Sequence, residues 1–134
     1  MITEEICTYE VCKLAKEKGF NLPSYFYYCR EELSNDGYFC CHNKGADYVC
    51  TAPTQALLQR WLREEKGIIV EVIAQPTCST PKKNCYWWSV KRNSDGFCYQ
   101  YEECSYILYS DEGYFNSYEL ALEDGLAHSL KNLI

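Results

Sequence analysis

Ten cysteines and two histidines are the residues of this sequence whose side chains bind metals or act as nucleophiles. Structural zinc sites use cysteine pairs with CxxC spacing, because two thiolates on one short turn can chelate the same ion. The sequence has no such pair: after the adjacent Cys40 and Cys41, the closest two are Cys7 and Cys12. Neighbouring residues of a strand point to opposite faces, which separates Cys40 from Cys41. The sequence therefore predicts no metal site and no cofactor.

A cysteine nucleophile needs an imidazole within hydrogen-bond reach of its thiol. His42 lies at the end of a predicted strand, and His128 lies on a predicted helix beside its apolar stripe. Nothing in the pattern brings either imidazole to a thiol. Adjacent acids occur in several places, but general acid–base catalysis needs carboxyl groups in different environments. The glycines form neither GxGxxG nor GxxxxGK, so a phosphate cradle is absent as well. We therefore predict that the protein is not an enzyme.

Aromatic residues are the other unusual feature, with thirteen tyrosines and three tryptophans. They follow one another along the predicted strands, so some of them must face away from the core. Most of these rings can simply cover a sheet, but Tyr and Trp on an uncovered face are typical of a protein-binding patch or a dimer interface. We predict a partner-binding surface that contains Tyr25, Tyr27, Tyr86, Trp88, Tyr99 and Tyr101.

The charge distribution favours a protein partner over a nucleic acid or a membrane. The net charge is −6, and residues 93–130 carry eight acids without a single Lys or Arg. Such a surface repels phosphate backbones and anionic lipids. It is either a solvated surface that keeps the protein soluble or a docking surface for a basic partner. The predicted partner is another protein or a second copy of the chain.

The cysteines are expected to be reduced, in a cytoplasmic protein. The N-terminal residues are acidic where a signal peptide carries Lys or Arg, and the longest apolar stretch, 68–74, is too short to span a bilayer. Most cysteines of this cysteine-rich chain lie inside apolar runs, where a thiol acts as a small hydrophobic group. A framework of disulfides is the alternative, and it is typical of secreted proteins.

Three helices are predicted from the spacing of apolar residues and from capping signals. The first covers 8–18, the second begins within 51–54 and ends at Gly67, and the third covers 117–133. Asn116 and the acid three residues later have the spacing of a capping box. Gly125 lies beside the apolar stripe of the third helix, which suggests that this helix approaches a sheet closely.

The remaining segments are predicted as strands. Residues 24–30 and 38–42 would form a hairpin around a turn at 34–37, and further strands are expected at 68–74, 85–92 and 97–102, with 105–110 as another strand or a continuation. The expected fold is a single α+β domain, residues 1–134, with an antiparallel sheet and three helices in the order α-ββ-α-βββ-α.

The second half of this order, α-β-β-β-α, is that of the double-stranded-RNA-binding fold, which suggests a nucleic-acid-associated protein as an alternative function. That fold presents basic residues at the start of its last helix. Here the corresponding helix begins with Ser117-Tyr118-Glu119 in the acidic part of the chain. We therefore expect little or no affinity for RNA.

Three segments of the chain resemble a family of short uncharacterised proteins of anaerobic gut bacteria and their phages and prophages. They are EVCKL through KGF at 10–20, TAPTQALLQRWLRE with the following Gly-Ile at 51–68, and NSYELALEDGL at 116–126. The resemblance covers most of the chain and implies a cytoplasmic location and a mobile-element origin. Together with the aromatic surplus, it predicts a non-enzymatic protein-interaction module, an accessory protein of phage or mobile-element origin.

Overall fold

The computed structural model describes residues 2–74, 86–92, 106–109 and 115–134. They form an α+β fold with the three predicted helices, antiparallel strands and one additional short strand, β3. The strand predicted at 97–102 lies outside the described residues, and the strand at 86–92 pairs with the one at 106–109. The helices and strands are α1 (Tyr9–Glu17), β1 (Ser24–Cys29), β2 (Glu32–Cys40), β3 (Val49–Thr51), α2 (Gln55–Lys66), β4 (Ile68–Ala74), β5 (Tyr86–Arg92), β6 (Tyr106–Tyr109) and α3 (Tyr118–Asn132).

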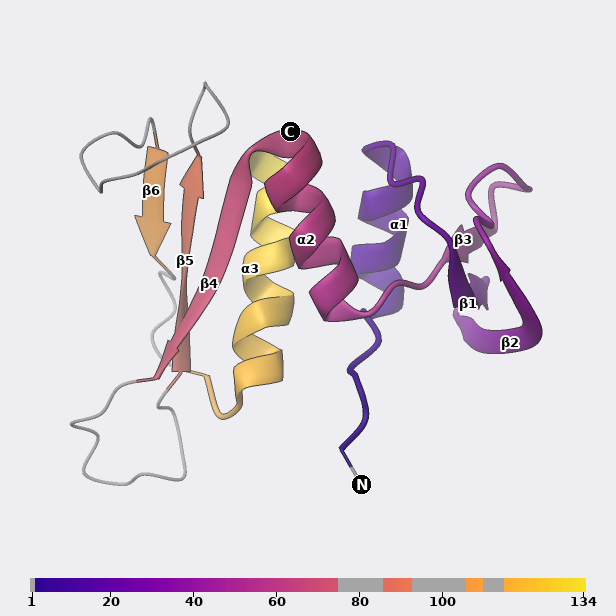
Figure 1. Cartoon of the computed structure of the whole chain (residues 1–134), viewed down its shortest axis with the longest axis horizontal. Coiled ribbons are helices and arrows are strands. Elements are labelled where there is room, and N and C mark those ends of the chain that lie inside the picture. Colours follow the sequence, from indigo (N-terminus) through magenta and orange to yellow (C-terminus); the bar gives the residue numbers. More distant parts are fainter. Residues whose placement is uncertain (1, 75–85, 93–105, 110–114) are drawn as a thin grey trace.

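The strands form two antiparallel sheets instead of the one sheet expected. The first sheet has the order β2-β1-β3 and the second the order β4-β5-β6. Figure 1 shows the three helices between them, with α3 beside the second sheet and α1 beside the first. The reason lies in α3, which buries a face broad enough to pack on β4 and β5 and to contact α1 and α2 as well. Because α1 in turn packs on β3, the helices form a layer with one sheet on each side.

Each helix begins at a hydroxyl-bearing cap. The side chains of Thr8, Thr54 and Ser117 each accept a hydrogen bond from the backbone N–H three residues later. This satisfies one of the N–H groups that have no partner inside the helix. The cap is therefore Ser117 and not Asn116, and the predicted capping box is not formed, because the residue three positions after Ser117 is Leu120 and not Glu or Gln. Ser117 has the extended backbone of a cap residue, with φ −142° and ψ 159°.

The close approach predicted at Gly125 is confirmed, and it joins α3 to the second sheet. A Cβ atom at Gly125 would lie 2.9 Å from Cγ1 of Val70 and 3.1 Å from Cγ of Trp88. Both neighbours belong to one buried cluster, to which all three helices and both sheets contribute. Only a residue without a side chain allows the helix to lie this near the sheet.

The first hairpin turns earlier in the chain than predicted. Cys29 pairs with Glu32, so Arg30 and the residue after it form a two-residue turn in place of the one expected at 34–37. Arg30 has a φ of 57°, in the left-handed region that favours glycine. Its N–H donates to the Tyr48 carbonyl at 2.7 Å, and its guanidinium lies 5.6 Å from the centre of the Tyr48 ring. These contacts with a distant segment hold a turn that the local sequence does not indicate.

The Asn-Asp-Gly segment forms a bulge inside β2 and not the turn of the hairpin. Between the flanking pairs, β1 has one residue where β2 has four, 36–39. The Asn35 side chain accepts a hydrogen bond from the N–H of Gly37 at 2.8 Å, and the Asp36 side chain accepts one from the N–H of Tyr38 at 3.1 Å. These local turn bonds replace ladder bonds, so the bulge projects from the sheet.

Among the helices of the described residues, none is both long enough and apolar enough to cross a bilayer.

Three of the described cysteines, Cys7, Cys12 and Cys50, are buried in the core beneath the first sheet. Cys29 and Cys41 are half-buried and Cys40 is exposed, so the expectation of buried thiols holds for part of this set. The pKa of the Cys7 thiol is raised by the side chain of Cys12, which lies against it, and by burial. Burial likewise raises the pKa of Cys50 to about 11 and that of Tyr28 to about 12. The core around these groups therefore favours their protonated forms.

We expect the protein to lose stability as the pH rises from about 9 to about 12. Cys50 and Tyr28 have raised folded-state pKa values of about 11 and about 12, against ordinary values of 9.0 and 10.0. Between the two values of each group the folded chain binds more protons than the unfolded chain, so a rise in pH favours unfolding. Below about pH 9 both groups are protonated in both states, and the full contribution to stability is present.

Urea unfolding at a series of pH values measures this loss. The variant Tyr28→Phe should lose less stability than the wild type between about pH 10 and 12. It should be less stable by about 1 kcal/mol at neutral pH, because the Tyr28 hydroxyl donates to the Cys7 carbonyl at 2.9 Å. Identical alkaline slopes for variant and wild type would contradict the prediction.

Candidate functional site

The face of the first sheet that lies away from α1 carries exposed aromatic side chains. Side chains alternate across a strand, so Tyr25 and Tyr27 share one face of β1 while Phe26 and Tyr28 share the other. The second pair packs against the core, where the Tyr28 ring meets Tyr9 of α1 edge-on at 5.7 Å. Tyr25 and Tyr27, both predicted as part of a binding surface, therefore lie on the outer face.

Residues of β2 and of the segment after it extend this layer of rings. The Phe39 ring lies 4.9 Å from Tyr25, and the His42 ring stacks on Tyr27 at 4.3 Å and an angle of 16°. Exposure reaches 72% for Tyr38, 58% for Phe39 and 51% for Tyr25. We call Tyr25, Tyr27, Tyr38 and Phe39 the hairpin aromatic surface. Large apolar side chains this exposed and this close together are typical of a protein-binding patch.

The hydrogen bonds of the first sheet show which backbone groups of β1 face which neighbour. The Phe26 carbonyl accepts from the N–H of Ala52 at 3.0 Å, and the Arg30 N–H donates to the Tyr48 carbonyl at 2.7 Å. Both bonds lead to the segment that contains β3. In an antiparallel sheet alternate residues of a strand direct their backbone groups to opposite neighbours. Tyr27 and Cys29 therefore direct their backbone N–H and C=O groups to β2.

The same alternation leaves one side of β2 free. Ser34 and Glu32 pair with those odd-numbered residues of β1 and direct their backbone groups inward. Leu33 and Asn35 consequently direct their N–H and C=O groups outward, away from β1. No other strand of the described residues pairs with this edge, and eight of the nine residues of β2 are exposed. An edge of this kind can accept an additional strand from another chain.

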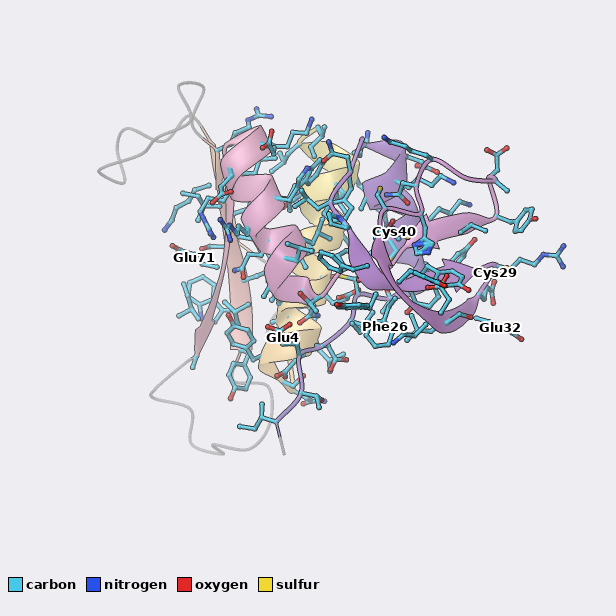
Figure 2. The ribbon with its side chains drawn as sticks, turned by 45° about the vertical axis from the view of Figure 1, so that its right-hand side comes forward. Glu4, Phe26, Cys29, Glu32, Cys40 and Glu71 are labelled. Carbon is cyan, nitrogen blue, oxygen red and sulfur yellow. The ribbon has the colours of Figure 1, made fainter. Side chains whose placement is uncertain are left out.

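A groove adjoins the hairpin aromatic surface where the first sheet meets α2. It has a volume of about 460 Å³ and is open to solvent. In Figure 2, Phe26 and Glu4 lie on the side of the first sheet nearer α2, whereas Cys29 and Glu32 lie at its far end. The groove is large enough to hold one or two side chains of a partner. Its walls include Tyr25, Phe26 and Phe39 from the sheet and Ala56, Leu57 and Arg60 from α2.

Negative charge predominates around this surface. Residues 24–51 carry four carboxylates and two cations, an excess of two negative charges. All six side chains are on exposed residues. A surface of this sign attracts a positively charged partner and repels phosphate groups. The carboxylates belong to Glu31, Glu32, Asp36 and Asp47, and the cations to Arg30 and Lys44.

An imidazole and a thiol meet at the end of β2, which the sequence reasoning missed. The Sγ atom of Cys40 lies 3.4 Å from Nε2 and 3.7 Å from Nδ1 of His42. A carboxyl oxygen of Asp36, in the bulge, lies 3.7 Å from the same Nε2. The expectation that no histidine lies near a thiol is thus wrong for His42. The spacing of Cys40 and His42 could have predicted this contact, because side chains two residues apart in extended backbone lie on the same side.

The other predicted surface residues do not join the hairpin aromatic surface. Tyr86 and Trp88 lie on the face of β5 that α3 covers, where Trp88 is 3% exposed and donates to Asp124 at 2.7 Å. Tyr86 is half-buried and meets the ring of Tyr118 of α3 edge-on at 6.5 Å. Trp88 is therefore a core residue, in contrast to the prediction. Tyr99 and Tyr101 lie outside the described residues.

Two acids of α3 act inside the fold rather than as a docking surface. Besides the bond from Trp88 to Asp124, Glu123 accepts hydrogen bonds from the N–H of Thr8 and from the side chain of Gln55, both at 2.7 Å. Thr8 caps α1 and Gln55 begins α2, so one carboxylate joins the N-terminal ends of two helices. Carboxylates are favoured at helix N-termini by the helix dipole. This part of the acidic segment is therefore structural.

No protein-family model, no curated protein and no solved structure matches this chain. The candidate site consequently stands on its own geometry, which comprises the hairpin aromatic surface, the free edge of β2 and the groove beside α2. Among the described residues, no group of three or more His, Cys, Asp and Glu side chains is arranged to hold a metal ion.

Proposed function

We propose that this chain is a non-enzymatic protein-interaction module that binds an extended, basic segment of a partner protein along β2. The observation that carries the proposal is the edge position of β2, a strand of nine residues of which eight are exposed. A segment added there would bond to the outward backbone groups of Leu33 and Asn35. The negative charge of the surroundings favours Lys or Arg in that segment.

The hairpin aromatic surface supplies the apolar part of the contact. Tyr38 and Phe39 both lie in the bulge, beside the edge to which the added segment would bind. Exposed aromatic rings contribute much of the binding energy at protein interfaces, because they bury a large area at a small cost in conformational entropy. The groove beside α2 would receive a side chain from the partner. The resemblance to proteins of gut bacteria and phages supports an accessory role, in the cytoplasm, for a protein of mobile-element origin.

The alternative function, nucleic-acid association, rests on the order α2-β4-β5-β6-α3. In this half α2 and α3 both pack on the second sheet, as in a double-stranded-RNA-binding arrangement. Order and packing say little about function, which depends on the site. The first turn of α3 carries Glu119 and no basic residue. The charge at this helix terminus therefore favours the protein-interaction module.

Selection from a random peptide display library is expected to enrich extended segments that combine Lys or Arg with apolar residues. The variant Leu33→Pro should weaken binding of a synthetic enriched peptide at least about tenfold, since proline removes the outward N–H of this edge position. Leu33→Thr is the matched control, because it retains the N–H and introduces a β-branched side chain that is suited to a strand. Binding is measured by fluorescence anisotropy, and it should weaken as the salt concentration rises.

Four results would count against the proposal. Enriched peptides that are acidic would contradict the charge argument, and equal binding by the Pro and Thr variants would exclude the edge of β2. Retardation of duplex RNA in a gel, weakening with salt, would favour the nucleic-acid alternative. A dimer that forms in sedimentation experiments and is lost in Leu33→Pro would make a second copy of the chain the occupant of the edge.

A further inference from the structure

An exposed thiol, an imidazole and a carboxylate lie together at the end of β2. Cys40 is exposed, and its sulfur lies 3.4 Å from Nε2 of His42, within the range of a hydrogen bond to sulfur. Asp36 places a carboxylate 3.7 Å from the same nitrogen. We propose that Cys40 is a thiol–disulfide exchange site for small neutral or positively charged disulfides, with His42 as the acceptor of its proton.

The structure holds the His42 ring in place beside the sulfur. One face of the ring stacks on Tyr27 at 4.3 Å, and the His42 side chain is only 13% exposed. The backbone N–H of His42 donates to the hydroxyl of Thr51 at 2.7 Å, and Thr51 is fully buried in β3. A base whose position is fixed by its neighbours needs no reorganisation before it accepts a proton.

These contacts assign a role to each group in the exchange. The Cys40 thiol transfers its proton to the imidazole of His42, and the resulting imidazolium is stabilised by the carboxylate of Asp36. The thiolate then attacks one sulfur of the incoming disulfide. A bond forms between Cys40 and that sulfur while the original S–S bond breaks, and the second sulfur leaves as a thiolate that takes up a proton. The incoming disulfide is the only oxidant, and one mixed disulfide and one thiol are the products.

The charge around Cys40 selects among disulfides. Asp36 lies beside the His42 ring, whereas Glu31 and Glu32 lie at the other end of the hairpin. At low salt the excess of two negative charges on residues 24–51 still acts on an approaching disulfide. This field disfavours anionic disulfides such as oxidised glutathione and favours a cation such as cystamine. The preference should diminish at high salt, because the charges are exposed to solvent.

Three of the other described cysteines lack the conditions for this reaction. Cys7, Cys12 and Cys50 are buried in the core. The pKa values of Cys7 and Cys50 are raised, which keeps these two thiols protonated and unreactive. Cys29 is half-buried on β1 and serves as the matched control, since it belongs to the same hairpin as Cys40.

The test uses the intact chain and the neutral chromogenic disulfide 4,4′-dithiodipyridine in stopped-flow measurements. The wild type should show a fast phase that is lost in Cys40→Ser and retained in Cys29→Ser. His42→Phe preserves an aromatic ring for stacking but has no proton acceptor, so the fast phase should slow by about tenfold or more near pH 6.5 and depend more steeply on pH. Circular dichroism and thermal unfolding establish that each variant is folded.

Mass spectrometry locates the modified cysteine. After brief exposure to cystamine, trypsin releases Cys40 together with Cys41 in the peptide 31–44 and Cys29 in the peptide 19–30, and fragmentation of 31–44 distinguishes the two adjacent cysteines. We expect the first adduct on 31–44, its loss in Cys40→Ser, and faster formation with cystamine than with oxidised glutathione at low salt. The inference is overturned if another peptide is modified first, if Cys40→Ser retains the fast phase, or if folded His42→Phe reacts at the wild-type rate. A preference for oxidised glutathione would overturn the stated substrate class.

Discussion

Replacing Gly125 with valine is expected to destabilise the protein by about 3 kcal/mol or more, because α3 has no room for a side chain at this position. The first added atom would lie 2.9 Å from Cγ1 of Val70 and 3.2 Å from Cβ of Trp88. Gly125→Ala gains about 1 kcal/mol of helix propensity but adds the same first atom. We expect it to be destabilising by about 1–2 kcal/mol overall. Urea unfolding gives both values.

Gly45→Ala is the control for this pair of variants. A Cβ atom at Gly45 would have its nearest neighbour, the His42 carbonyl oxygen, at 3.4 Å, an ordinary contact. The φ of Gly45 lies outside the left-handed region. This substitution should leave the free energy of unfolding unchanged or raise it by up to about 1 kcal/mol, because alanine lowers the conformational entropy of the unfolded chain. An increase in stability in Gly125→Ala would show that α3 does not lie against the second sheet in this way.

Replacing Glu123 with alanine is expected to destabilise the protein by about 2–3 kcal/mol. The substitution removes the acceptor of two hydrogen bonds of 2.7 Å, from the N–H of Thr8 and from the side chain of Gln55. Gln55 is 5% exposed, so its amide group would lose a partner that water cannot easily replace. The negative charge that favours the N-terminal ends of α1 and α2 disappears as well. Chemical unfolding measures the loss.

Two further variants separate these contributions. Glu123→Gln keeps a side-chain oxygen of the same reach but removes the charge, so its effect should lie between those of the wild type and Glu123→Ala. Glu119→Ala, at an exposed position in the first turn of the same helix, should change the free energy of unfolding by no more than about 0.5 kcal/mol. Equal effects at Glu119 and Glu123 would show that the junction of the three helices contributes nothing specific.

The helices were predictable because their signals are local. A hydroxyl at each start, apolar residues at helical spacing and glycines at the ends of the first two define them within a few residues, and Gly67 has the expected left-handed φ of 66°. Gly125 was also informative, because glycine within a helix lowers stability, and a close packing contact is a common compensation for that cost. Antiparallel pairing followed from short connections between strands.

The first hairpin was misplaced because its turn depends on distant contacts. Asn35-Asp36-Gly37 has the composition of a hairpin turn, and its side chains do form local turn bonds. The chain nevertheless reverses at Arg30, where the backbone and ring of Tyr48 stabilise an unfavourable φ. Such a contact spans many residues and leaves no local pattern, and the division into two sheets has a similar origin in the broad buried face of α3.

The candidate site was predictable in part. Alternation along β1 placed Tyr25 and Tyr27 on one face, and that face is exposed. The same strand rule, applied to β5, placed Trp88 on one face with Tyr86 but did not show that α3 would cover it. Tyr38 and Phe39 are exposed because of the bulge, in a region where the sequence predicted the turn of the hairpin. The proximity of Cys40 and His42 required only their spacing of two residues.

The bulge at 36–39 also limits how far chains can associate through this edge. Strand addition that propagates from molecule to molecule requires a long, flat, regular ladder, and here the regular part of β2 ends after four residues, at Asn35. A short ligand strand fits this length, whereas open-ended stacking of identical chains does not. Because of the bulge, we expect the exposed aromatic edge of β2 to have little tendency to form fibres even at high protein concentration.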